Sequence, residues 1–162
     1  MVAVLAHALG VIRRDIFHQP CDVNALATAA LYHDASEILT GDLPTPIKYH
    51  NAEIMSAYHA VEDLAVQKLL GMLPPELRAT YADVLAEDKD GSIYPLVKAA
   101  DKLSAYIKCI EERKAGNNEF LSAEAQTRAA LDASPLPEVQ YFLEHFIPAF
   151  ERDLDELGAI GQ

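Results

Sequence analysis

Helical periodicity is the feature that most constrains how this chain can fold. Apolar residues recur at helical spacing along most of its length, whereas the alternation of apolar and polar residues typical of strands is nearly absent. Glycine and proline interrupt the pattern in a few places, above all between Thr40 and Pro46. With 162 residues, 51% of them hydrophobic, the chain is long enough to bury one full core. We therefore predict an all-α fold, a single domain over residues 1–162 built as a bundle of six to seven helices.

The boundaries of the expected helices follow from capping and helix-breaking residues. Asp22 is a predicted N-cap, Gly116 a predicted left-handed C-cap, and Pro148 predicts a kink in the last helix. Leu64, Leu69 and Leu70 are expected core residues of the third helix. The expected helices run from the start to Ile16, Asp22 to Leu39, Ile47 to Met72, Pro74 to Ala86, Ile93 to Ala115, Asn117 to Asp132 and Pro137 to Leu157.

Charge and hydropathy exclude several classes of partner. A net charge of −12 argues against a surface for nucleic-acid polymers, which usually bind a basic face. No stretch reaches the roughly 18–20 consecutive apolar residues that a membrane span requires. Cys21 and Cys109 are too few for a disulfide framework and form no CxxC motif. We expect a cytoplasmic protein that binds neither a nucleic-acid polymer nor a membrane.

His33 and Asp34 stand side by side in an Ala-rich, apolar run. A carboxylate in such a setting is costly unless a cation or a hydrogen-bond donor compensates it. Glu37 follows four residues after His33, so on a continuous helix both would project from one face, about one turn apart. A divalent metal with an acid/base carboxylate beside it would account for all three residues.

Asp101 is a second candidate ligand, in the middle of an expected helix with apolar neighbours. The simpler alternative is a solvated aspartate that pairs with a nearby lysine. Together, His33, Asp34 and Asp101 make a nitrogen and oxygen ligand set suited to a divalent transition metal.

The chain here resembles a known family. His33-Asp34 with a downstream helical aspartate is the pattern of the HD-domain metal-dependent phosphohydrolases. The run from Tyr32 to Pro46 is similar, more narrowly, to the bacterial HD-domain 5′-deoxynucleotidases. This likeness continues through Val97 to Glu112, through Ala115 to Phe120 and into the last helix, so that it covers essentially the whole chain.

The resemblance implies an enzyme that removes the 5′-phosphate from deoxyribonucleoside monophosphates and discriminates against ribonucleotides. It implies catalytic roles for Glu37 and Asp34, a homodimer, and cobalt or manganese as the metal. The implied metal ligands are His33, Asp34 and Asp101, and the implied substrate contacts are Asp34, Asp42, Leu43, Pro44, Thr45 and Asp101. Asp42 has the alternative reading of a solvent-facing turn residue.

One part of the family pattern lacks a counterpart in this sequence. The first His ligand of the family would fall just before Met1, and an Arg-Trp pair would fall further upstream. His7 lies about nine residues from the missing ligand, which on a helix is roughly half a turn out of phase, so it cannot replace that ligand. We expect a chain truncated at its N-terminus relative to the family, or a natural short relative with impaired metal binding.

Two other functions remain open at this point. The absence of the upstream His and of the Arg-Trp pair favours a non-catalytic or impaired HD-fold module, either a nucleotide-binding sensor or an assembly domain. The third possibility is an HD hydrolase that acts on other phosphate esters.

Overall fold

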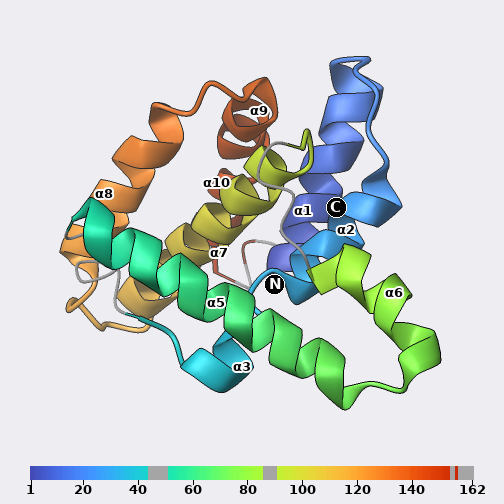
Figure 1. Ribbon diagram of the computed structural model, residues 1–162. Coiled ribbons are helices and arrows are strands. Elements are labelled where there is room, and N and C mark those ends of the chain that lie inside the picture. The colour runs from blue at the N-terminus through green and yellow to red at the C-terminus, as the bar shows by residue number, and fades with distance from the viewer. Residues whose placement is uncertain (44–50, 86–90, 154–155, 157–162) are drawn as a thin grey trace. The chain divides into compact units, whose positions relative to one another are not determined.

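The computed structural model describes residues 1–43, 51–85, 91–153 and 156 of the chain (Figure 1). Within these ranges the regular elements are helices, and no strand occurs. The predicted all-α class is therefore confirmed. The chain divides into two compact units: unit 1 comprises Met1–Ala30 and Asp90–Gln162, and unit 2 comprises Leu31–Lys89.

Unit 1 is built from the two ends of the chain. Its first helix continues without a break into a π-helical turn, so the predicted helix to Ile16 is confirmed. Its elements are α1 (Val2–Val11), η1 (Ile12–Ile16), most of α2 (Val23–Tyr32), α7 (Tyr94–Lys114), α8 (Leu121–Asp132), α9 (Pro137–His145) and α10 (Ile147–Glu151).

A continuous apolar core holds unit 1 together. The long helix α7 contacts α1, α8 and α10, and it presents buried residues at helical spacing. Fully buried side chains from five helices meet in this core, among them Leu9, Leu26, Leu96, Leu103, Ile107, Ile110, Leu131 and Val139. Each such side chain removes enough apolar surface from water to stabilise the fold by about 1.5–3 kcal/mol.

Residues with strong backbone preferences explain three of the helix ends of unit 1. Asp22 is the predicted N-cap of α2, and its Oδ1 accepts a hydrogen bond of 2.9 Å from the backbone N–H of Ala25. Gly116 ends α7 with a φ of +86°, the left-handed conformation that favours glycine. The last predicted helix breaks between α9 and α10 at Phe146, as expected from Pro148, which lacks the N–H that would continue the ladder.

The predicted start of α8 at Asn117 is wrong, because α8 begins at Leu121. The side chain of Asn117 accepts a hydrogen bond of 3.1 Å from the N–H of Glu119 and donates one of 2.9 Å to Glu112. An asparagine side chain that bonds nearby backbone in this way stabilises a turn in place of a helix.

Unit 2 contains α3 (Glu37–Thr40), α5 (Ala52–Met72) and α6 (Pro75–Leu85), with α5 in contact with both of the others. Asn51 caps α5, because its side chain accepts a hydrogen bond of 2.8 Å from the N–H of Ile54. Helix α6 begins at Pro75, one residue after the predicted start at Pro74. The predicted start of the third helix at Ile47 lies outside the described residues.

The predicted helix from Asp22 to Leu39 is not continuous. Helix α2 ends at Tyr32, a turn occupies residues 33–36, and α3 begins at Glu37. The N–H of Ala35 bonds to the carbonyl of Tyr32 at 2.9 Å, and that of Glu37 to the carbonyl of Asp34 at 3.0 Å. These bonds span three residues instead of four, which tightens the chain and ends the α-helical ladder.

Unit 2 has little core of its own. Among its described residues Ala65 is the buried one, and Leu64, an expected core residue, is 57% exposed. The expectation for Leu64 was therefore wrong, whereas Leu69 and Leu70 are partly buried. Its exposed large apolar residues are Leu31, Ile38, Leu39, Val61, Leu64, Met72 and Leu77.

No helix in the described ranges combines the length and the hydropathy needed to cross a membrane.

Candidate metal and active site

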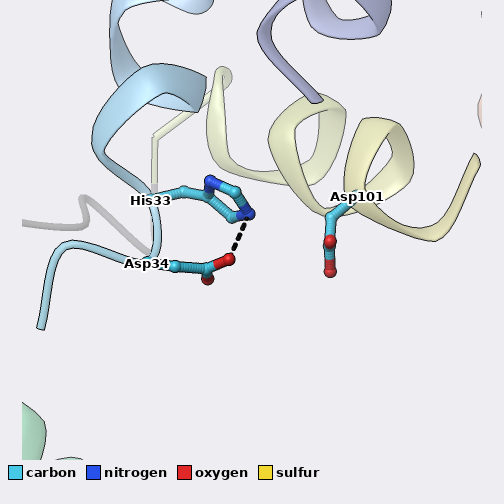
Figure 2. Close-up of side chains that lie close together, drawn as sticks. All are labelled: His33, Asp34 and Asp101. Atoms are coloured by element: carbon cyan, nitrogen blue, oxygen red, sulfur yellow. Dashed lines mark ion pairs between the residues drawn. The ribbon is translucent and has the colours of Figure 1, made fainter. Parts of the chain in front are cut away.

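His33 and Asp34 form a close pair in the turn that follows α2 (Figure 2). The Nε2 atom of His33 lies 2.9 Å from Oδ2 of Asp34, and their side chains are 9% and 49% exposed. The imidazole is thus largely buried while the carboxylate opens to solvent. A nitrogen and an oxygen this close share either a proton or a cation, because their lone pairs would otherwise repel each other.

The turn itself makes this pairing possible. On an α-helix, side chains of consecutive residues diverge by about 100° and do not face each other. Because the chain leaves the helical conformation after Tyr32, His33 and Asp34 can turn toward one another. The ring of Tyr32 packs edge-on against Tyr81 of α6, with centroids 6.1 Å apart, which ties the start of the turn to α6.

Glu37, the predicted acid/base carboxylate, is the first residue of α3. Its carbonyl accepts a hydrogen bond of 2.9 Å from the N–H of Gly41, and its side chain is partly buried. The argument that Glu37 and His33 share a helix face does not hold, because a turn separates them. The catalytic role of Glu37 stays a prediction.

Asp101 lies within α7 in unit 1. It occupies an exposed position, whereas its neighbours Ala100 and Leu103 are fully buried in the core of that unit. Figure 2 draws Asp101 on α7 together with the His33 and Asp34 side chains. Its position in the middle of a long, well-packed helix gives its carboxylate a rigid base.

The predicted substrate segment begins directly after α3. Gly41 ends α3, Asp42 is exposed and Leu43 is partly buried. Pro44 and Thr45, the other predicted contacts in this segment, lie outside the described residues.

Sequence reasoning missed two polar residues that the fold uses. Glu138, in the first turn of α9, is fully buried with Oε1 3.3 Å from Nε of Arg13. Tyr58 on α5 donates a hydrogen bond of 3.2 Å from its hydroxyl to the carbonyl of Gly41. These contacts join residues far apart in the sequence, so no local pattern could have indicated them.

The chemistry of the pair in unit 2 fits a divalent metal. Imidazole nitrogen and carboxylate oxygen are the ligand types that divalent transition metals accept together. His33 supplies the former and Asp34 the latter. A third carboxylate would complete a set with room for water, which is the arrangement of hydrolytic metal sites.

Comparison with known proteins defines the class. The structure is similar to that of an HD-domain phosphohydrolase from Listeria innocua, with a TM-score of 0.79 and 26% sequence identity. The similarity covers 92% of this chain and 72% of that one. The fold and the His33–Asp34 pair together place the protein among the HD-domain phosphohydrolases. These proteins are metal-dependent hydrolases.

The family is narrower than the class. This chain belongs to the YfbR-like 5′-deoxynucleotidase family, whose model matches residues 1–150. A relative named 5′-deoxynucleotidase YfbR from Shigella flexneri serotype 5b is 49% identical over 161 residues, which are 97% of this chain and 79% of the relative. The relative of the same name from Escherichia coli K12 is 48% identical over the same shares.

Proposed function

We propose that this protein is a phosphomonoesterase that hydrolyses deoxyribonucleoside 5′-monophosphates to the deoxynucleoside and phosphate. The observation that carries this proposal is 49% identity, over 97% of the chain, to a relative named 5′-deoxynucleotidase. The His33–Asp34 pair supports it with the chemistry that such an enzyme requires. Discrimination against ribonucleotides is part of the proposal.

His33, Asp34 and Asp101 hold a divalent cation in this proposal, with cobalt or manganese as the preferred ion. The binding of a divalent cation is supported by the His33–Asp34 pair, in which one ligand nitrogen and one ligand oxygen lie 2.9 Å apart. When bound, such an ion supplies Lewis acidity that polarises a phosphoryl oxygen and lowers the pKa of water.

The side chains of the chain itself have the following proposed roles. Asp34 orients the attacking water in line with the departing 5′-oxygen, which its half-exposed carboxylate can reach. Glu37 moves the proton as general acid/base. Asp42, with Leu43, Pro44 and Thr45, contacts the nucleotide, and the exposure of Asp42 leaves its carboxylate open to a sugar hydroxyl.

A homodimer in the cytoplasm completes the proposal. The exposed apolar residues of α3 and α5, including Ile38, Val61 and Leu64, would gain from coverage by a second copy. Cys21 and Cys109 are both free, as in a reducing compartment.

Phosphate release tests the function and separates it from the alternatives. The purified protein is assayed with dAMP, AMP and a generic phosphate ester, each with added cobalt or manganese. We expect release from dAMP far above release from AMP and the ester. Comparable turnover of all three would indicate an HD hydrolase of other esters, and nucleotide binding without phosphate release would indicate a non-catalytic module.

A further inference from the structure

Helix α3 is weakly anchored for an element that begins with a proposed catalytic residue. It has four residues, none of them buried, and Ile38 is 76% exposed. A helix this short is not stable by itself, because forming its first turn costs more conformational entropy than its few hydrogen bonds return. Its orientation therefore depends on contacts with α5, the helix against which it packs.

The backbone of Gly41 makes the hydrogen bonds that hold α3 in place. Its carbonyl accepts a hydrogen bond of 3.2 Å from the hydroxyl of Tyr58 on α5 and one of 2.9 Å from the hydroxyl of Thr40. Its N–H donates to the carbonyl of Glu37 at 2.9 Å. Gly41 is thus bonded to the first residue of α3 on one side and to α5 on the other.

The backbone conformation of Gly41 determines where Asp42 goes. Its φ of 70° and ψ of 163° lie in a region that side-chain-bearing residues hardly populate. A Cβ at this position would meet nothing within 4 Å, so the conformation and not a lack of space favours glycine. Rotation of this peptide would redirect Asp42, the next residue, so whatever holds the Gly41 carbonyl also holds Asp42.

We propose that Tyr58 is a positioning residue for recognition of the nucleotide sugar. Its hydroxyl fixes the Gly41 peptide and thereby the placement of Asp42 relative to Glu37. Loss of this bond widens the range of directions that Asp42 samples and weakens discrimination between deoxyribose and ribose. The inference rests on the proposed function for its substrate, but the anchoring itself does not.

Tyr58→Phe tests the inference, because it removes the hydroxyl and keeps the ring. We expect KM for dAMP to rise about three- to tenfold, the size of one lost hydrogen bond, with kcat changed less than about twofold. The ratio of kcat/KM for dAMP over AMP falls by a similar factor. Unchanged KM and an unchanged ratio in an active Tyr58→Phe variant would overturn the specificity role.

The matched control is Tyr141→Phe in unit 1. Tyr141 packs against Phe17, His145 and Phe146 through its ring, so loss of its hydroxyl should leave KM and the dAMP/AMP ratio as they are. Equal effects of the two substitutions would show a general loss of stability and would contradict a specific role of Tyr58.

Thr40→Val gives a second variant at the same carbonyl. Because Tyr58 and Thr40 both bond the oxygen of Gly41, their effects on KM should not add in the double variant. Strict additivity would mean that the two hydroxyls act independently and would contradict a shared anchor.

Hydrogen exchange separates failure of this inference from failure of the proposed function. The amides of residues 37–43 should exchange faster in Tyr58→Phe than in the unaltered protein, whatever substrate the enzyme uses. If the unaltered protein releases no phosphate from dAMP, the proposed function fails and exchange alone decides the anchoring. Equal exchange in the two proteins would refute the anchoring directly.

Discussion

The two units differ in how they are held together. Unit 1 surrounds α7 with a continuous core of buried apolar side chains from α1, α2, α8, α9 and α10. Among the described residues of unit 2, Ala65 is buried, while leucine, isoleucine and valine side chains on α3, α5 and α6 remain exposed. The first unit is a packed scaffold, and the second is a set of short or lightly packed elements.

The residues with proposed roles in the chemistry are divided unevenly between the two units. Asp101 stands on α7, the best-packed helix, whereas His33, Asp34, Glu37 and Asp42 lie in turns or at helix ends of unit 2. Ligand-binding segments are commonly drawn from regions of low local stability. We therefore expect changes in unit 2 to affect activity more than folding, and changes in the unit 1 core to do the reverse.

The largest expected effect is on catalysis in unit 2. Glu37→Gln should lower kcat for dAMP about 10²–10⁴-fold, because the amide cannot transfer the proton. The unfolding midpoint should change little, since the Glu37 side chain is only partly buried. Glu53→Gln, in the first turn of α5, is the control and should keep full phosphate release. Turnover retained by Glu37→Gln would refute its role.

Truncation of the unit 1 core gives the next largest effect, this time on stability. Leu103→Ala should lower the free energy of unfolding by about 2–5 kcal/mol, because it leaves a cavity at a fully buried position of α7. Leu64→Ala on α5 should cost less than about 0.5 kcal/mol, because Leu64 is already exposed. Urea denaturation measures both, and equal losses would remove the contrast between the units.

A smaller loss of stability is expected where ion pairs connect helix ends of unit 1. Arg113 on α7 donates to Glu124 of α8 at 3.0 Å and to Glu151 of α10 at 2.7 Å, and these bonds raise its pKa. Arg113→Met should lower the free energy of unfolding by about 1 kcal/mol, since the ion pairs are partly exposed and screened. Arg14→Met breaks a half-exposed pair with the neighbouring Asp15, which joins no two helices, and should cost less. An equal cost in both variants would contradict a bridging role.

The smallest expected effect is on how the stability of the protein depends on pH. Glu112 accepts a hydrogen bond from Asn117 and lies near Lys108, and both lower its pKa. A depressed pKa contributes stability above the unfolded-state value, near 4.3, and this contribution disappears as pH falls through the folded-state value. The melting temperature of Glu112→Gln should therefore lie slightly below that of the unaltered protein at pH 7, and the gap should close toward pH 3. A gap that widens on acidification would contradict this assignment.

Local sequence signals predicted the elements of the packed unit better than those near the site. Asp22 as a cap, Gly116 as a helix end and the break before Pro148 each depend on one residue whose backbone preference is strong. The apolar pattern of α7 likewise follows from its burial in the core. Such features are decided within a few residues of the chain.

The region around the site could not be predicted in the same way. Apolar residues continue at helical spacing past Tyr32, which predicts a longer helix. The chain nevertheless turns at His33, where hydrogen bonds that span three residues replace those of the α-helix. The pairing of His33 with Asp34 follows from that turn, and the anchor of Gly41 comes from Tyr58, which is 17 residues away. Tertiary contacts override local propensity at these positions.

The central proposal is that His33, Asp34 and Asp101 bind a single divalent ion. Manganese titration followed by electron paramagnetic resonance tests it in the unaltered protein and in the Asp34→Ala and Asp101→Ala variants. We predict one tight site per chain, lost or weakened at least tenfold by either substitution. Binding by Asp101→Ala equal to that of the unaltered protein would contradict the account.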